Sequence, residues 1–170
     1  MKAEELREMQ APFKALYRDV PEKAVITLKA QGRLGEGITC KVETGRAGAE
    51  AGLHPATGGD GIALCSGDML LEALVACAGV TMNAVATALE LPLRGATVKA
   101  EGDLDFRGTL GIDKTAPVGF REIRLSFDID SDATRDQLDT LMKLTERYCV
   151  VFQTLNKRPE LKIARRVTAQ

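Results

Sequence analysis

Residues 65–90 read CSGDMLLEALVACAGVTMNAVATALE, an apolar and alanine-rich stretch. The stretch predicts a helix with an N-cap candidate at Ser66, an acid in its first turn at Asp68 and an end before Pro92. Its polar positions share one narrow stripe, formed by Glu72, Asn83, Thr87 and Glu90. Nearly all other positions are apolar, so we expect protein to cover this helix on most sides. Cys77 lies away from the polar stripe and is expected to face inward.

The C-terminal half of the chain alternates between strand and helix patterns. The expected elements are strands at 96–106 and 119–130, a helix capped by Ser131 or Asp132 that runs to about Tyr148, a short helix at 150–156 and a closing strand at 161–169. The long helix has an inner stripe made of Leu138, Leu141, Met142, Thr145 and Tyr148. Cys149 continues this stripe if the helix runs on. If the two main helices pack together, the sulfurs of Cys77 and Cys149 approach each other.

The N-terminal part begins with a helix-like segment at 2–17, which has an apolar face. Alternating residues predict strands at 24–33 and 37–44, joined as a hairpin by a glycine-rich turn. Residues 45–61 are rich in glycine and alanine and lack periodicity, so we expect a long loop there. Antiparallel strand pairs separated by helices are typical of an α+β fold.

Length and composition indicate one soluble domain, which we place at 21–170 after an N-terminal helix at 1–20. Hydrophobic residues make up 45% of the chain, enough for a sizeable core. Lys and Arg number 23 against 24 Asp and Glu, so nucleic acid is not an expected partner. The charged N-terminus does not resemble a secretory signal, and no apolar run approaches the roughly 20 residues of a membrane span. We therefore expect a cytoplasmic protein with no membrane partner.

The four cysteines, Cys40, Cys65, Cys77 and Cys149, are too few and too scattered for a disulfide scaffold. A packed core thiol is the default role of each. For Cys77 and Cys149 a redox role is the alternative to packing in the core. Cys65 is either a packed thiol or a third redox thiol. The single histidine, His54, lies in the expected loop, where nothing places it as a base for a thiol or as a metal ligand with Cys40 and Cys65.

Several motifs resemble those of the OsmC/Ohr family of thiol-dependent peroxidases. Residues 66–81, SGDMLLEALVACAGVT, resemble its first cysteine motif, and residues 146–155, ERYCVVFQTL, resemble its second. The segments at 95–108 and 119–130 resemble its central hairpin, and KAQGRLGEG at 29–37 resembles a hairpin turn with a conserved arginine. The resemblance covers roughly residues 24–168. It implies an OsmC-like fold with antiparallel sheets around two central helices, in an intertwined homodimer with active sites at the subunit interface.

The resemblance also implies roles for four residues. Cys77 matches the peroxidatic thiol, which attacks a peroxide O–O bond and becomes a sulfenic acid, and Cys149 matches the cysteine that resolves it as a disulfide. Arg33 matches the arginine that stabilises the thiolate and binds peroxide oxygens, with a solvated turn residue as the alternative. Asp68 stands near the acid that holds this arginine, and it also suits compensation of the helix dipole. No cofactor and no metal are implied.

The expected function is a thiol-dependent hydroperoxide reductase that acts in the response to oxidative stress. The apolar surroundings of Cys77 favour organic hydroperoxides over hydrogen peroxide. The expected partners are an external dithiol, from a lipoyl protein or a small thiol, and a second copy of the chain. The alternatives are a non-enzymatic binder of an apolar or electrophilic small molecule on the same fold, and a cysteine-nucleophile hydrolase or acyl-transfer enzyme with His54 as its base.

Overall fold

The computed structural model describes residues 2–20, 24–25, 27, 31–34, 39–43 and 48–167, and within these ranges it leaves out the side chains of residues 13, 17, 18, 31–34 and 39–43. The elements in chain order are α1 (Ala3–Asp19), β1 (Gln31–Leu34), β2 (Thr39–Glu43), β3 (Gly48–Gly52), the 3-10 turn η2 (Pro55–Thr57), β4 (Leu64–Cys65), α2 (Ser66–Ala88), β5 (Leu93–Asp103), α3 (Phe106–Thr109), β6 (Glu122–Ser131), α4 (Arg135–Tyr148) and α5 (Val150–Asn156). The predicted α+β class is confirmed.

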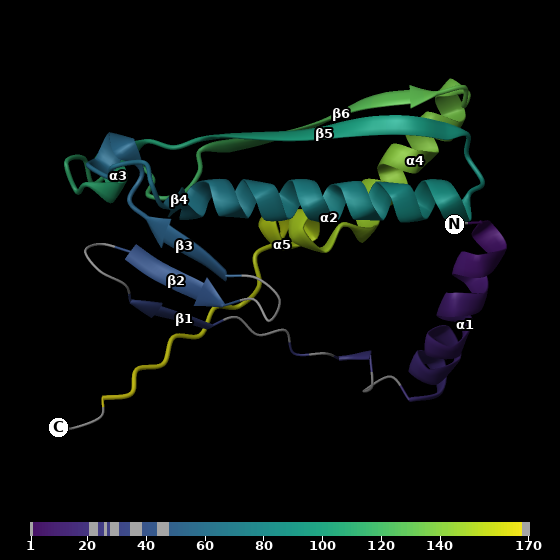
Figure 1. Ribbon diagram of the computed structural model, residues 1–170, viewed down its shortest axis with the longest axis horizontal. Helices are drawn as coiled ribbons and strands as arrows, with labels where there is room; N and C mark the ends of the chain where they lie inside the picture. The colour runs from purple at the N-terminus through teal and green to yellow at the C-terminus, as the bar shows by residue number, and fades with distance from the viewer. Residues whose placement is uncertain are drawn as a thin grey trace.

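Helix α2 is the centre of the fold. The long β5–β6 ribbon runs alongside it, and α4 and α5 also pack against it (Figure 1). Its buried stripe consists of residues four positions apart, Leu74, Ala78, Met82 and Ala86. Since residues i and i+4 lie on one face of a helix, this spacing turns a single side of α2 toward the core.

Two buried clusters fill the space between α2 and its neighbours. The first joins Leu74 and Ala78 to Cys149, and the second joins Met82 and Ala86 to Leu141 of α4. Partly buried side chains of β5 and β6 pack on both clusters and include Val98 and Phe127. The two long helices therefore pack together, which meets the condition under which the two cysteines were expected to approach each other.

The opposite side of α2 carries apolar side chains that nothing in the described part of the chain covers. Leu70, Ala73, Ala76 and Val80 are exposed, and Val80 is 73% exposed. The prediction that protein covers α2 on most sides is therefore wrong for the single chain. The prediction about membrane length was also wrong, because α2 is long and apolar enough to cross a membrane by length and composition. Core helices of soluble proteins share those properties.

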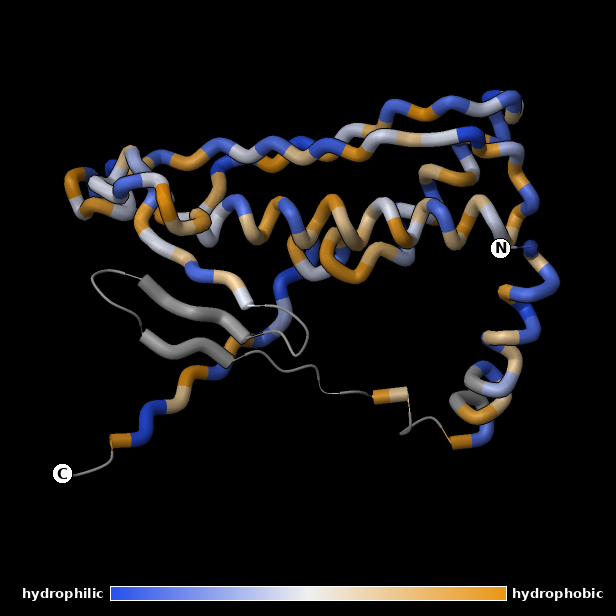
Figure 2. Tube along the Cα trace, in the orientation of Figure 1, coloured by the Kyte–Doolittle hydropathy of each residue, from blue (hydrophilic) through white to orange (hydrophobic). Residues whose placement is uncertain are grey.

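Strands β5 and β6 form an antiparallel pair, which confirms the hairpin predicted at 96–106 and 119–130. Val98 pairs with Phe127 and Ala100 with Leu125, and successive residues of β6 alternate between exposed and half-buried. This alternation is visible as changing hydropathy along both strands (Figure 2). The apolar face of the ribbon covers α2, while charged side chains point away from it.

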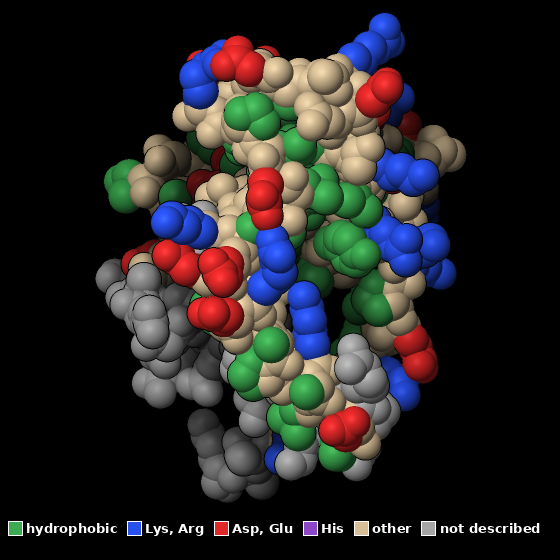
Figure 3. All heavy atoms as spheres, turned by 90° about the vertical axis from the view of Figure 1, so that its right-hand side faces the viewer, with side chains coloured by type: hydrophobic (Ala, Val, Ile, Leu, Met, Phe, Trp, Pro, Cys, Tyr) green, Lys and Arg blue, Asp and Glu red, His purple; other side chains and the backbone are tan. Residues whose placement is uncertain are grey.

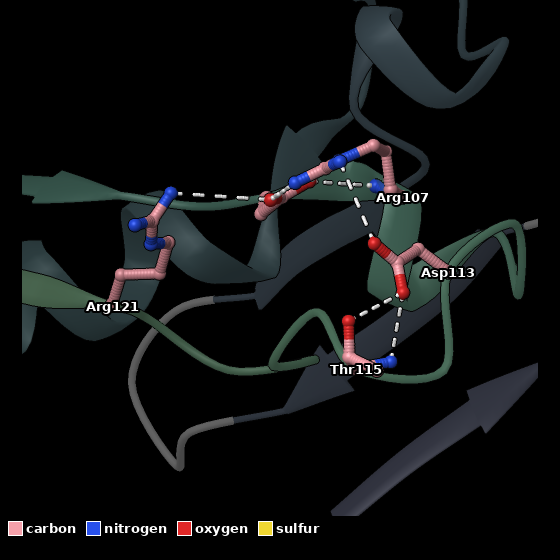
Figure 4. Close-up of polar contacts among 5 residues, drawn as sticks. Arg107, Asp113, Thr115 and Arg121 are labelled. Carbon is pink, nitrogen blue, oxygen red and sulfur yellow. Dashed lines mark hydrogen bonds and ion pairs between the residues drawn. The ribbon is translucent and has the colours of Figure 1, made fainter.

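The connection from β5 to β6 is stabilised by a cluster of charged side chains (Figure 4). Arg107 donates to both carboxylate oxygens of Asp105 at 2.9 and 2.6 Å, and it lies 3.5 Å from Asp113. Asp113 accepts from the backbone N–H and the hydroxyl of Thr115. The side-chain hydrogen bonds from Arg107 are the largest cause of the shift that lowers the pKa of Asp105 to about 2. The cluster is a structural device that closes the loop between the strands.

The second sheet has the order β1–β2–β3–β4. β1 and β2 form the predicted antiparallel hairpin, although β1 overlaps the expected strand at 24–33 only in residues 31–33, and described residues 24, 25 and 27 are not in a strand. The prediction of a long loop at 45–61 is wrong, because this segment contains β3 and η2. β3 pairs with β4 in parallel, so this sheet is mixed and the expectation of purely antiparallel sheets needs correction. Ladder hydrogen bonds on both sides of β3 outweigh the low strand propensity of its glycines.

Three predicted helix details also need correction. The N-cap of α2 is Cys65 and not Ser66, and the N-cap of α4 is Thr134, which forms a reciprocal capping box with Gln137. A capping box satisfies two unpaired groups at once, which favours Thr134 over Ser131 or Asp132. Tyr148, expected on the inner stripe, is 56% exposed because α4 ends there. The predicted helix at 150–156 is confirmed as α5.

Helix α1 begins beside the C-terminal end of α2, and residues 157–167 extend away from the helices (Figure 1). The predicted N-terminal helix is confirmed as α1, and its Arg7 forms an ion pair with Glu90 beyond the end of α2, at 2.6 Å. The face on that side of the molecule carries interspersed acidic and basic side chains (Figure 3).

The prediction of a closing strand at 161–169 is wrong for residues 161–167. These residues are exposed and pair with none of the described strands, and Ile163 is 98% exposed. Residues 168–169 lie outside the described residues.

Candidate functional site

The two cysteines singled out in the sequence meet where α2 passes the junction of α4 and α5. Cys149 is both the last cap of α4 and the first cap of α5, with an extended backbone (φ −71°, ψ 106°) that turns the chain between the two helices. It is 1% exposed, and Cys77 is half-buried and packs against its cluster. The Cys149 side chain forms a hydrogen bond with the sulfur of Cys77. The structure therefore brings together two residues that lie far apart in the chain.

The surroundings of Cys77 favour its thiolate. Burial is the largest single influence and raises its pKa, but four hydrogen bonds act in the opposite direction, and together they hold the pKa below its ordinary value. The donors are the backbone N–H groups of Val151 and Val150, the Cys149 thiol and the Thr81 hydroxyl. Hydrogen bonds to the charged form of an acid stabilise that form. Cys77 is thus the more acidic thiol of the pair.

Cys149 is shifted the other way. Burial raises its pKa most, and the hydrogen bond it donates to Cys77 and the negative charge of that thiolate raise it further. Backbone N–H groups of Phe152 and Val151 offset only part of this effect. The pair therefore consists of a more acidic thiol, Cys77, and a less acidic thiol, Cys149.

Sequence reasoning did not identify the donors around Cys77. Thr81 lies one turn after Cys77 on α2, and the first backbone N–H groups of a helix have no partner within the helix. The short helix predicted directly after Cys149 could have indicated the other donors, because the free backbone N–H groups of its first turn favour a negatively charged group nearby. Which sulfur they reach depends on how α5 packs against α2.

A cavity of about 380 Å³ lies beside Cys149. Its apolar wall comes from α2, β6, α4 and α5 and contains Ala78, Leu125, Phe127, Met142 and Phe152 together with Cys149. Lys143 and Glu146 of α4 also line it and are exposed. Thr145, 1% exposed, contributes a hydroxyl that has no hydrogen-bond partner in the part of the chain that the structure describes. Buried polar groups without a partner are rare in native proteins.

The other two predicted site residues are not brought to the sulfurs by the described contacts. Asp68 lies in the first turn of α2, exposed, nine residues before Cys77 and hence about 14 Å away along the helix axis. It has no hydrogen bond or ion pair with any side chain that the structure describes. Arg33 lies in β1, paired with Lys41 of β2, and its side chain falls outside the described residues.

The remaining candidates have other surroundings. Cys65 is half-buried at the start of α2, where its sulfur lies near Gly67. His54 stacks on Phe106 at 5.0 Å and accepts a hydrogen bond from the Ala56 backbone, which caps η2. Cys40 lies in β2, and its side chain is outside the described residues. Among the described residues no group of three or more His, Cys, Asp and Glu side chains is placed to hold a metal ion.

Comparison with known proteins agrees with this architecture. The family described as OsmC-like protein matches residues 58–164, more than half of the chain. No curated protein matches. Among solved structures, an OsmC-like protein from Mycoplasma pneumoniae superposes with a TM-score of 0.65 at 19% identity, covering 78% of this chain and 89% of that one.

Two further structures come from proteins named for organic hydroperoxide resistance. The protein from Elizabethkingia anophelis superposes with a TM-score of 0.62 at 17% identity and covers 79% of this chain and 91% of its own. The protein from Legionella pneumophila has a TM-score of 0.61 at 16% identity, with 78% and 91% coverage. At these identities the likeness establishes the fold. The chain has an α+β OsmC-like fold, and it belongs to the OsmC-like protein family.

Proposed function

We propose that this protein is a thiol-dependent peroxidase that reduces organic hydroperoxides to alcohols. One observation carries the proposal: Cys77 has a lowered pKa and accepts a hydrogen bond from Cys149, a second thiol whose pKa is raised. Peroxide reduction by thiols needs a nucleophilic thiolate and a second thiol within reach. Relatives named for organic hydroperoxide resistance support the same chemistry.

The proposed reaction has two steps on the protein. The Cys77 thiolate attacks one peroxide oxygen, the O–O bond breaks, and the alkoxide leaves and takes a proton to become the alcohol. Cys77 then holds a sulfenic acid. The Cys149 sulfur attacks Cys77, hydroxide leaves with the Cys149 proton as water, and a Cys77–Cys149 disulfide forms. An external dithiol reduces this disulfide, which requires a compartment that keeps thiols reduced, and we therefore place the protein in the cytoplasm.

Arg33 is proposed to complete the site by binding the peroxide oxygens. Its planar guanidinium carries several donors in a fixed geometry, which suits two adjacent oxygens. Asp68 is proposed to orient this arginine. Both roles rest on the family resemblance, and in a dimer either residue can come from the neighbouring copy.

A homodimer is proposed from the exposed apolar side of α2. Leu70, Ala73, Ala76 and Val80 share this side, and helical spacing places Cys77 between it and the buried stripe. An unpartnered apolar helix face on this scale marks an interaction site. A second copy packed there would cover Cys77. Analytical ultracentrifugation tests this proposal. We expect the wild type to sediment as a dimer and Val80→Asp as a monomer. A dimeric Val80→Asp protein would contradict an interface on this side of α2.

Peroxide consumption with dithiothreitol tests the function directly. Wild type, Cys77→Ser and Cys149→Ser are compared, with Cys65→Ser as the matched control. We expect Cys77→Ser to be inactive, and Cys149→Ser to turn over poorly and to accumulate a sulfenic acid that dimedone traps. The control should keep wild-type activity. Equal activity in all four proteins would refute the proposal.

The preference for organic hydroperoxides rests on the apolar residues around Cys77, which include Leu74 and Val151. Burial of an alkyl chain contributes about 0.8 kcal/mol per CH₂ group. We expect a higher kcat/KM for cumene or lipid hydroperoxide than for hydrogen peroxide. Equal values would contradict the preference.

The second candidate is a non-enzymatic binder of an apolar small molecule, which the cavity at Cys149 favours. It differs from the peroxidase in thiol reactivity. A binder would leave hydroperoxide unconsumed in the presence of a dithiol, and both of its thiols would react slowly at neutral pH.

A further inference from the structure

We propose that the Thr145 hydroxyl is a hydrogen-bond donor to the Cys149 thiolate, the form of this side chain that attacks oxidised Cys77. The inference rests on the proposed peroxidase function and adds one residue to it, which acts only in the resolving step. It also explains why the core holds a buried hydroxyl at a position where valine would be more stable.

The Thr145 hydroxyl differs from the other threonine hydroxyls of the helices. Thr87, Thr140 and Thr154 each donate to the backbone carbonyl four residues earlier. The Thr145 hydroxyl makes no such bond to Leu141, and it has no other partner in the part of the chain that the structure describes. Thr145 is nevertheless 1% exposed. A buried hydroxyl without a partner calls for an explanation, and a role in the reaction is one of the few available.

Helix geometry places this hydroxyl beside Cys149. The Cys149 backbone N–H donates to the Thr145 carbonyl at 3.0 Å, and the φ of Cys149, −71°, is still that of a helix. The Cα–Cβ bonds of helical residues tilt toward the N-terminus, so the Cys149 side chain leans over the turn that contains Thr145. Side chains four residues apart are neighbours, with Cβ atoms about 5–6 Å apart. Both side chains line the same cavity.

The protonation state of Cys149 explains why the hydroxyl has no partner before the reaction. Burial raises the pKa of Cys149 most, and the Cys77 thiolate raises it further, so the reduced protein keeps the Cys149 proton. The sulfur of a neutral thiol is a weak acceptor, whereas an ionised acceptor forms hydrogen bonds about twice as strong as a neutral one. The Thr145 hydroxyl therefore gains a strong acceptor only when Cys149 loses its proton.

The surroundings of Cys149 make a further donor valuable at that moment. Its only other donors among the described residues are the backbone N–H groups of Phe152 and Val151. The ionisable side chains in the described cavity wall, Lys143 and Glu146 of α4, are exposed and opposite in charge, and β6 and α5 contribute apolar side chains. A hydrogen bond to a charge is stronger in such apolar surroundings than in water.

The resolving step balances with Thr145 as a donor alone. The Cys149 sulfur bonds to the sulfur of the Cys77 sulfenic acid, the S–O bond breaks, and its electron pair leaves with the oxygen as hydroxide. The hydroxide takes the proton that Cys149 releases and becomes water. Cys149 is oxidised and the sulfenic sulfur is reduced. Thr145 keeps its own proton throughout.

The same kind of contact is already present at the other sulfur. Thr81 lies one turn from Cys77 on α2, and its hydroxyl donates to that sulfur in the reduced protein. Each cysteine thus has a threonine one helical turn away, and each hydroxyl serves the sulfur that carries the charge in its own step.

The rate of disulfide formation tests the inference. One equivalent of cumene hydroperoxide is added at pH 7, and acid quenching, alkylation and peptide mass mapping follow Cys77 oxidation and disulfide formation separately. Thr145→Val should slow disulfide formation about tenfold, as expected for loss of a hydrogen bond to a charged group, and should leave Cys77 oxidation unchanged. Thr140→Val, the same change at an exposed residue of α4, is the matched control and should alter neither rate.

The possible outcomes of this experiment separate the inference from the proposed function. Disulfide formation at the wild-type rate in Thr145→Val would overturn the inference and leave the proposed function intact. No disulfide in the wild type after peroxide treatment would overturn both.

A second pair of variants separates the hydroxyl from the packing of the side chain. Thr145→Ser and Thr145→Ala both lose the methyl group, and only the serine keeps the hydroxyl. The serine variant should form the disulfide at close to the wild-type rate, and the alanine variant should be as slow as Thr145→Val. Equal slowing in both would assign Thr145 to packing and overturn the inference.

The pKa of Cys149 provides a measurement that needs no peroxide. In a Cys77→Ala background, alkylation of Cys149 by iodoacetamide is followed against pH by peptide mass mapping. Adding Thr145→Val should move the midpoint upward by about one pH unit, because the thiolate loses a donor worth about tenfold in its ionisation. An unchanged midpoint would contradict the proposed hydrogen bond.

Discussion

The Cys149 thiol forms a hydrogen bond with the sulfur of Cys77, where the junction of α4 and α5 packs against the middle of α2. This contact affects the two residues in opposite directions, because it stabilises the negative charge of one sulfur and retains the proton on the other. It gives two chemically identical side chains different acidities. The following predictions test this asymmetry and the packing that creates it.

Thr81→Val removes one donor to the Cys77 thiolate. The pKa of Cys77 should rise, since its thiolate loses a hydrogen bond. Alkylation of Cys77 by iodoacetamide at pH 7 should slow by about tenfold, within the free energy of a hydrogen bond to a charged group. The rate should recover at a pH well above the pKa, where the thiolate forms in both proteins. Thr87→Val, whose hydroxyl donates to the Asn83 carbonyl on the same helix, is the control and should keep the wild-type pH profile.

The pH dependence of the two thiols should differ in the wild type. The lowered pKa of Cys77 means that its reactivity persists as the pH falls toward neutral and is lost only below its folded-state pKa. The raised pKa of Cys149 means that this thiol becomes reactive only at a higher pH. Alkylation followed by peptide mass mapping across pH 5 to 10 measures both curves. Coincident curves would contradict the asymmetry.

Thr145→Val should stabilise the free protein. It replaces a buried hydroxyl without a partner by a methyl group of similar shape, and relief of such a group is worth about 1–3 kcal/mol in the free energy of unfolding. Thr145→Ser keeps the hydroxyl and loses a methyl group, so it should destabilise the protein by about 1 kcal/mol. Urea unfolding measures both changes. A destabilised valine variant would mean that the hydroxyl has a partner in the folded protein.

Leu141→Ala should be strongly destabilising. Leu141 of α4 is fully buried and packs in one cluster with Met82 and Ala86 of α2. A leucine-to-alanine change in such a core lowers the free energy of unfolding by about 2–5 kcal/mol. Leu161→Ala, at a side chain that is 81% exposed, should change stability by less than about 0.5 kcal/mol. Urea midpoints separate the two outcomes. Similar midpoints would show that α4 is not essential to the core.

Arg33→Lys tests the proposed peroxide-binding role. Lysine keeps the charge and loses the planar set of donors, so kcat/KM for cumene hydroperoxide should fall roughly tenfold to a hundredfold. Arg165→Lys, an exposed residue of the C-terminal segment, is the matched control. Full activity of Arg33→Lys would show that the guanidinium of Arg33 does not bind the peroxide and that Arg33 is only a residue of the hairpin.

The local patterns of the sequence predicted the elements around α2 well. Alternation along 96–106 and 119–130 corresponds to β5 and β6, and the apolar, capped stretch at 65–90 corresponds to α2. These patterns are readable because each follows the period of its own backbone. Residues 48–52 are different, since Gly48–Gly52 becomes a strand only through pairing with β2 and β4. At residues 161–167 the prediction was wrong in the opposite sense, because this strand-like pattern pairs with none of the described strands.

The sequence by itself determined that Cys77 lies off the polar stripe of one helix and that Cys149 follows the apolar stripe of another, because side-chain direction follows from helical spacing alone. The tertiary structure decided which of them becomes acidic and which faces a cavity. Those properties depend on backbone N–H groups of α5, the Thr81 hydroxyl and the burial of Cys149, which meet only when α4 and α5 pack on α2. The pKa of a thiol is set by charges and donors within a few ångströms, and residues distant in the sequence supply them.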